Sequence, residues 1–204
     1  MRPSERIVSI ELVWRGPFGW PGARNEVHVR NLGDSKFADH CGLYLWTVNY
    51  EAGFLVYAAG YTNRPFRVRF REHTRAYRSG VYTIFDASIL KRGRREVVWP
   101  GFWFGRRSVS AEREYAERES EIRIAADRLL DAYRVFVAPV EASQRVLQRI
   151  EAAIMNALYF ASGIVGEIPD RGMALTPRRD SEDPILVHNS CEQLIYGLPE
   201  QFQV

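Results

Sequence analysis

Runs of apolar residues along the first third of the chain predict short β-strands. Residues 7–14, 42–49 and 53–59 are rich in branched and aromatic side chains, which favour strands. The second and third runs are separated by only a short polar stretch, so we expect them to pair as an antiparallel hairpin. Weaker strand patterns cover residues 26–30, 81–87 and 135–140.

Helical periodicity follows the hairpin. Pro65 suits the first turn of a helix, which we predict to run to about Arg78 and to end before Gly80. Apolar stripes at helical spacing predict two more helices, over residues 110–133 and 141–160. Residues 88–107 are predicted to be irregular, and residues 167–204 to be loop-like with apolar patches at 185–187 and 193–198.

Together these elements predict one α+β domain over residues 1–204. Its sheet is expected to be small and antiparallel, built on the 42–60 hairpin and flanked by helices. An N-terminal strand precedes this core, residues 88–133 form an insertion, and residues 167–204 form a C-terminal extension. A length of 204 residues fits one domain. The composition, 46% apolar and 26% charged, excludes a disordered or fibrous chain.

Several classes of protein are excluded or disfavoured by the same composition. No apolar run approaches the roughly 20 residues of a membrane span. Residues 1–6 lack the basic and apolar pattern of a signal peptide. The two cysteines, Cys41 and Cys191, lie outside any CxxC or Cys/His cluster, which disfavours a disulfide framework and a zinc site. We therefore expect a reduced, cytoplasmic protein without a membrane partner.

The basic residues are almost all arginines. The net charge is +3, and Lys36 and Lys91 are the only lysines. The arginine guanidinium matches phosphate oxygens well, although a GC-rich genome would also encode arginine in place of lysine. Two clusters, interleaved with aromatic residues, predict a nucleic-acid surface, and those aromatics could equally belong to the core. The predicted nucleic-acid contacts are Arg64, Arg67, Arg71, Arg75, Lys91, Arg92, Arg94 and Arg95.

Four features with chemical potential follow one another along the predicted elements. The sequence Gly42-Leu43-Tyr44 opens the first hairpin strand, and Tyr57-Ala58-Ala59-Gly60 closes the second. Arg69 and His73 are one turn apart, on one face of the following helix. Glu151 lies in the middle of the last apolar helix, where plain solvent is not its expected surrounding.

This ordered set resembles the GIY-YIG nuclease superfamily. The GLY triplet at 42–44 is similar to the first family element, and GYTNRPFRVRFREH at 60–73 is similar to its glycine–turn–helix segment. The stretch RIEAAIMNAL at 149–158 is similar to the segment that holds the family's metal-binding glutamate. The resemblance covers residues 38–160, with a long gap between His73 and Glu151.

The resemblance implies a metal-dependent endonuclease that hydrolyses DNA phosphodiester bonds, with a possible setting in restriction or phage defence. Glu151 would bind Mg²⁺ or Mn²⁺, and Arg69 would stabilise negative charge on the phosphate. Tyr44 would act as, or relay to, the general base, which requires a lowered phenol pKa. His73 would contact the phosphate or assist proton transfer. Cutting both strands with one site per chain would suit a homodimer, although no residue identifies an interface.

One position departs from the family pattern. The family's second tyrosine lies two residues before the glycine, but here that position is Ala58. Tyr57 is one residue out of register and would point to the other face of the strand unless a bulge re-aims it. Three interpretations follow: Tyr57 serves through a bulge, Tyr61 or another group replaces it, or the site lacks this phenol and is slow or inactive.

Two rival functions remain open. The first is a catalytically degenerate GIY-YIG fold that binds nucleic acid without cutting it, for which Ala58 is the motive. The second is a structural protein whose arginine clusters meet an acidic partner protein. Salt-dependent binding to DNA would separate the second rival from the other readings, because phosphate contacts release counterions.

Overall fold

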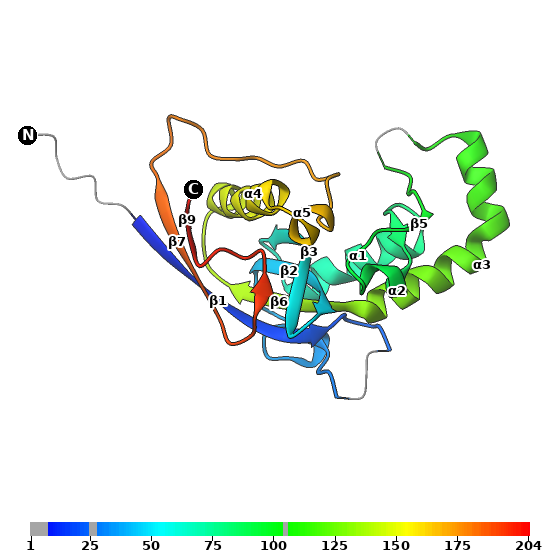
Figure 1. Cartoon of the computed structure of the whole chain (residues 1–204), viewed down its shortest axis with the longest axis horizontal. Coiled ribbons are helices and arrows are strands. Elements are labelled where there is room, and N and C mark those ends of the chain that lie inside the picture. The colour runs from blue at the N-terminus through cyan, green and yellow to red at the C-terminus, as the bar shows by residue number, and fades with distance from the viewer. Residues whose placement is uncertain (1–7, 25–27, 104–105) are drawn as a thin grey trace, which may run out of the picture.

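The structure, a computed structural model, describes residues 8–24, 28–103 and 106–204 (Figure 1). Its main feature is a seven-stranded mixed sheet that curls around one helix. The strands are β1 (Val8–Gly19), β2 (Gly42–Tyr50), β3 (Gly53–Thr62), β6 (Tyr133–Pro139), β7 (Ile185–Cys191), β8 (Ile195–Tyr196) and β9 (Gln201–Gln203). Their order is β8-β3-β2-β6-β1-β7-β9. A separate two-stranded sheet pairs β4 (Ile84–Phe85) with β5 (Val97–Trp99).

The prediction of a small antiparallel sheet is therefore wrong. The centre, β3-β2-β6, is antiparallel, and so are the β1–β6 and β7–β9 pairs, but the sheet as a whole is large and mixed. β1 and the tail strand β7 pair in parallel, and so do β3 and β8. The tail was predicted to be loop-like, but its two apolar patches supply β7 and β8, which extend the sheet on both sides.

β1 bends so that it can pair with different neighbours at its two ends. Its first part, Val8–Trp14, lies parallel to β7, and its last part, from Arg15 onward, pairs with β6 after a shift in register. Gly16 lies at the bend with φ +155, where an added Cβ would be 2.7 Å from the Val135 carbonyl oxygen. A glycine is needed there because any side chain would collide with β6.

The helices cover both faces of the central strands. They are α1 (Phe66–Arg78), α2 (Ala87–Leu90), α3 (Val109–Ala132), α4 (Gln144–Phe160) and α5 (Ile164–Glu167), with a short 3₁₀ helix at Leu32–Asp34. Ser108 and Ser143 cap α3 and α4, since each side-chain oxygen accepts a hydrogen bond from the first turn. We call residues 66–132, which carry α1, α2, α3 and the β4–β5 sheet, the helical lobe; it projects to the right in Figure 1.

Two apolar cores result from this arrangement. Leu43 and Leu45 of β2 face α4, whereas Tyr44 and Trp46 face α1 and α3 of the helical lobe. β2 is thus buried on both faces, which explains why its sequence is almost continuously apolar rather than alternating.

Other predicted elements can be compared one by one with the structure. The hairpin, the helices around residues 66–78, 110–133 and 141–160, and the strand at 135–140 are confirmed. The 81–87 strand is reduced to β4 and is followed at once by α2, and β5 lies in the segment predicted to be irregular. Of the predicted strand at 26–30, residues 26 and 27 lie outside the described residues, and residues 28–30 form no strand.

Candidate active site

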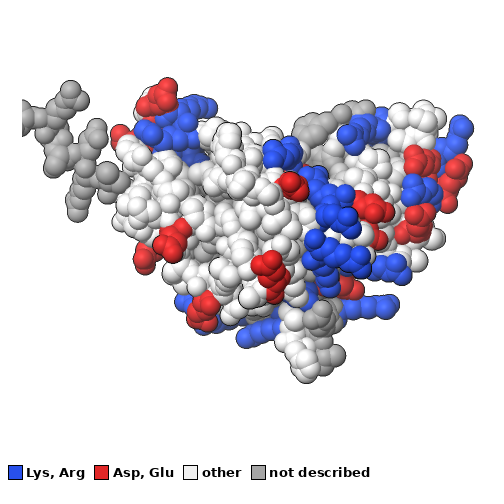
Figure 2. Space-filling view, in the orientation of Figure 1, with Lys and Arg blue, Asp and Glu red and all other residues white. Residues whose placement is uncertain are grey.

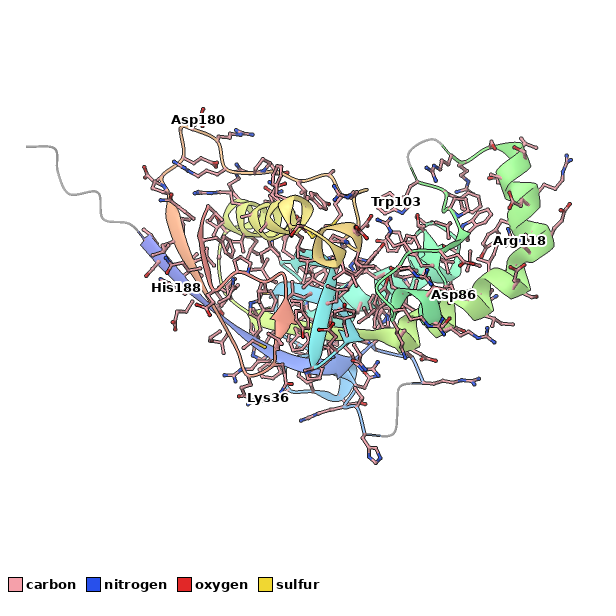
Figure 3. All side chains as sticks on the ribbon, in the orientation of Figure 1. Lys36, Asp86, Trp103, Arg118, Asp180 and His188 are labelled. Carbon is pink, nitrogen blue, oxygen red and sulfur yellow. The ribbon has the colours of Figure 1, made fainter. Side chains whose placement is uncertain are left out.

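A cavity of about 550 Å³ opens between the central sheet, the helical lobe and the segment that follows α5. Residues of β2, β3, α1 and α4 line one part of it, and residues from 82–85, 95–103 and 170–174, together with Arg106, line the rest. Figure 3 shows Trp103 between α5 and the main body of the helical lobe. The five predicted catalytic residues all line this cavity, although they come from four different elements: Tyr44, Tyr57, Arg69, His73 and Glu151.

A β-bulge in β3 brings Tyr57 to the cavity. Trp46 pairs with Ala58 and Thr47 pairs with Val56, so Tyr57 is an extra residue in the β3 ladder. Tyr57 and Ala58 consequently pack on the same face as Tyr44. This geometry is the one required by the first interpretation of the Ala58 position, in which a bulge re-aims Tyr57.

Tyr61 lies on the opposite face of β3 and is not near the cavity. It packs with the core under α4, and its hydroxyl accepts a hydrogen bond from Gln148 Nε2 at 3.1 Å. The structure therefore does not bring Tyr61 to the predicted site. Tyr57, in contrast, lines the cavity, and its hydroxyl forms no hydrogen bond with any residue that the structure describes.

A chain of hydrogen bonds links the polar residues of the cavity. The Tyr44 hydroxyl lies 2.9 Å from His73 Nε2, and the Tyr82 hydroxyl lies 3.0 Å from His73 Nδ1. Arg69 Nε donates to the Tyr44 hydroxyl at 3.4 Å. Tyr82 was not predicted from the sequence, because it lies in the predicted strand 81–87 and belongs to no motif. Because Tyr82 occupies the second ring nitrogen, it fixes the His73 ring orientation, and its hydroxyl can donate to or accept from that nitrogen.

Gly60 makes room for the Tyr44 ring. The two residues are direct cross-strand partners, and a Cβ at Gly60 would be 2.4 Å from the Tyr44 hydroxyl oxygen. Tyr44 lies over the bare backbone of β3 and reaches α1, where its hydroxyl meets His73 and Arg69. The glycine that ends the hairpin motif therefore has a packing role in the site.

Burial controls the protonation of Tyr44 and His73. Burial raises the pKa of Tyr44 above its ordinary value of 10.0, and the nearby Arg69 only partly opposes this rise. The expectation of a lowered phenol pKa is therefore wrong for the protein alone. Burial, reinforced by the charge of Arg69, holds the pKa of His73 well below 6.5, so the ring is neutral. A neutral imidazole has one acceptor nitrogen, which can accept the Tyr44 proton.

Glu151 is a partly buried carboxylate that forms no ion pair with any residue the structure describes. Burial raises its pKa from 4.5 to about 7, and Arg69 opposes this rise. Glu151 forms no ion pair or hydrogen bond with another residue in the described part of the chain. Its helix neighbours have other partners: Arg145 pairs with Glu182 at 2.6 Å, and Arg149 donates to backbone oxygens of Asp183 and Val204.

The Glu151 carboxylate is the type of donor that binds Mg²⁺ or Mn²⁺. No cluster of three or more His, Cys, Asp or Glu side chains occurs in the described ranges. Mg²⁺ and Mn²⁺ are commonly held by one or two carboxylates, with water and substrate oxygens as the other ligands. A cation beside Glu151 would also offset the cost of ionising a buried carboxylate. The residues therefore fit a magnesium or manganese ion bound by Glu151.

The predicted nucleic-acid contacts fall into two groups. Lys91, Arg92 and Arg94 are exposed between α2 and β5. Figure 2 shows a band of Lys and Arg near the middle of the view, beside the helical lobe. Arg95 ends this group at the cavity wall, with its guanidinium 4.8 Å from the Phe85 ring centroid. Arg69, Arg106 and Arg171 also line the cavity, so arginines outnumber the acids Glu151 and Asp170 there.

The second group lies on the outer flank of α1. Arg67, Arg71 and Arg75, with Arg78 and Arg123, line an open groove between α1 and α3. Arg67 pairs with Asp39 at 2.7 Å, whereas Arg71 and Arg75 have no ion-pair partner among the described residues. Arg64 forms a bidentate pair with Glu72, with both distances 2.7 Å, and contributes little free charge.

No family model, curated protein or solved structure matches this chain. Within the described residues, no helix is both long and apolar enough to cross a membrane.

The burial of Glu151 predicts a pH-dependent effect of Glu151→Gln on stability. Between pH 4.5 and pH 7 the folded state holds the Glu151 proton more tightly than the unfolded state, so wild-type stability falls as pH rises. Glutamine cannot ionise and does not lose this stability. We expect the variant to match the wild type near pH 5 and to exceed it by about 1–3 kcal/mol at pH 8.

Urea unfolding of both proteins without divalent cations, at several pH values, measures this difference. The matched control is Glu141→Gln, an exposed glutamate before α4 that does not line the cavity. A Glu151→Gln difference that stays constant from pH 5 to pH 8 would contradict the burial argument.

Proposed function

We propose that this protein is a metal-dependent endonuclease that hydrolyses phosphodiester bonds of DNA. The observation that supports the proposal is the convergence of Tyr44, Arg69, His73 and Glu151 on one arginine-lined cavity. This convergence agrees with the resemblance to GIY-YIG nucleases, for which the same residues carry the motif. The resemblance supplies the reaction class, and the cavity supplies a place where the residues can act together.

Arg69 is placed to stabilise the charge that develops on the phosphate. Its guanidinium is partly buried, and its contact with the Tyr44 hydroxyl holds it at the cavity wall. A fixed positive charge in a partly dry site stabilises a pentavalent phosphorane more effectively than the same charge in water. Arginine also offers paired donors that match two phosphate oxygens.

Tyr44 and His73 together provide a route for the proton of the attacking water. The water gives its proton to the Tyr44 oxygen while the Tyr44 hydroxyl passes its own proton to His73 Nε2, 2.9 Å away. The water oxygen forms a bond to phosphorus, the bond to the leaving 3′ oxygen breaks, and solvent protonates that oxygen. Because both proton transfers occur together, no free phenolate is needed despite the raised pKa of Tyr44.

A divalent cation held by Glu151 would supply Lewis-acid chemistry to the scissile phosphate and the leaving oxygen. Tyr57, re-aimed by the bulge, offers a second hydroxyl to the phosphate from β3. We also propose a cytoplasmic location, which suits the free cysteines Cys41 and Cys191.

A second candidate function is a module that binds nucleic acid without cutting it. The raised pKa of Tyr44 and the lowered pKa of His73 favour it, because both make the proton relay less ready to act. The cleavage experiment below separates the two functions.

Plasmid cleavage tests the proposed reaction. We expect Mg²⁺-dependent nicking of supercoiled plasmid by the wild type. Tyr44→Phe removes the hydroxyl of the relay, and Arg69→Gln removes charge stabilisation, so each should lower the rate at least about 100-fold. The matched control Tyr61→Phe removes a phenol from the other face of β3 and should keep the rate within about twofold, as expected for a residue without a transition-state role. Wild-type protein that binds DNA but never nicks it would contradict the endonuclease.

The groove on the outer flank of α1 makes a separate prediction about DNA affinity. Replacing both Arg71 and Arg75 with Gln should flatten the plot of log affinity against log salt by about 1.8, at about 0.9 per lost phosphate contact. Fluorescence anisotropy with a labelled duplex at several salt concentrations measures the slope. The control Arg113→Gln alters an exposed arginine of α3 outside the groove. An unchanged slope in the double variant would remove this groove from the DNA-binding surface.

A further inference from the structure

The cavity has an aromatic part that the proposed phosphodiester chemistry does not use. Phe85, Val97, Trp103 and Met173 line it beside the polar residues already described. A phosphate group needs charge and hydrogen-bond donors, not apolar walls. A volume of about 550 Å³ lies within the range of roughly 300–1,000 Å³ for small-molecule sites. The remaining volume and its aromatic lining therefore suit a ligand group with a flat, apolar face.

Trp103 is the most accessible aromatic side chain of this part. It is 38% exposed, although it lies at the wall of a cavity, and its ring is stacked on Tyr82 with centroids 5.1 Å apart and planes at 12°. Tyr82 in turn contacts His73 through its hydroxyl. The aromatic part is thus joined to the proton relay by one residue, so a group stacked at Trp103 would lie next to the reacting phosphate.

Polar groups accompany these aromatic faces. The Arg95 guanidinium lies over the Phe85 ring and donates to the Pro169 carbonyl at 3.1 Å, which leaves other N–H groups on this cation. The Asp170 carboxylate is anchored by the Gly172 amide at 2.9 Å and also lines the cavity. A flat ligand with donors and acceptors along its edge matches this combination of ring faces, donors and acceptor.

We infer that the aromatic part of the cavity binds an unpaired nucleobase of a nucleic-acid substrate, next to the scissile phosphate, with Trp103 as its stacking surface. This inference rests on the proposed function and narrows its substrate to nucleic acid with an extrahelical nucleotide. A base is the flat, edge-polar group that a nucleic acid carries beside each phosphate. A base within a duplex cannot enter such a cavity, so it must leave the stack, as in enzymes that flip a base into a pocket.

Nucleotide binding without catalysis tests this inference. We would compare 2′-deoxyadenosine 5′-monophosphate with 2-deoxyribose 5-phosphate by calorimetry, with the full chain and no divalent cation. The nucleotide should bind about 5- to 150-fold more tightly, which is the range expected for stacking of one base on an aromatic side chain. Trp103→Ala should remove most of this preference, and Trp103→Phe should retain most of it.

The control is Phe160→Ala, an aromatic residue that is 88% exposed and does not line the cavity. It should leave both affinities unchanged, and circular dichroism of each variant checks that it folds. Equal binding of the nucleotide and the sugar phosphate would overturn the inference. So would a Trp103→Ala protein that keeps the preference of the wild type.

A second comparison identifies the source of the base. Under the same cation-free conditions, a duplex with one unpaired adenosine should bind more tightly than a fully paired duplex, and more tightly than the mononucleotide. Tighter binding of the mononucleotide would assign the cavity to a free nucleotide and overturn the assignment to a nucleic-acid base.

The plasmid assay distinguishes a failure of the base-binding inference from a failure of the proposed endonuclease function. Trp103-dependent nucleotide binding without any nicking would reject the endonuclease and leave a nucleotide site. Nicking without a preference for the base would keep the endonuclease and reject the base pocket.

Discussion

The hydrogen bond between Tyr44 and His73 joins the sheet to the helical lobe, and the geometry of the site depends on it. Tyr44 comes from β2, which is buried on both faces, and His73 comes from the buried face of α1. Both groups are polar inside an aromatic core, so each must have a partner, because an unpaired buried hydroxyl or imidazole is costly. Their mutual hydrogen bond satisfies this requirement. Arg69 and Tyr82 extend it at its two ends, so that a series of four hydrogen-bonded side chains lines the cavity.

The same burial determines the chemistry of the cavity. It keeps His73 neutral and Tyr44 protonated, and it raises the pKa of Glu151 to about 7. A divalent cation and a phosphate diester would bring the opposite charges that such a site lacks. Under the proposed function, the raised pKa of Glu151 suits a site that a divalent cation completes, whereas the pKa values of Tyr44 and His73 suit the alternative of binding without cutting.

Local sequence patterns predicted the centre of the fold. The remaining parts depend on contacts between distant segments of the chain, which local patterns do not reveal. Strong periodicity identified the β2–β3 hairpin, α1 and α4, and the resemblance to GIY-YIG nucleases singled out the motif residues that they carry. β7 could not be predicted in its place because its partner β1 lies at the other end of the chain. Tyr57 needed a bulge, which depends on how Trp46 and Thr47 pair across the hairpin. Tyr82 carried no motif, and only its contact with His73 shows its place in the site.

The central claim is that Glu151 binds the divalent cation of a phosphodiester-cleaving site. Electron paramagnetic resonance titration with Mn²⁺ tests it most directly, with wild-type protein and Glu151→Gln in the presence of duplex DNA. At a pH above 7, the account predicts one bound Mn²⁺ per wild-type chain and a large loss of affinity in the variant. Equal Mn²⁺ binding by the two proteins would contradict the account, because it would assign the bound cation to another group, such as the carboxylate of Asp170 that also lines the cavity.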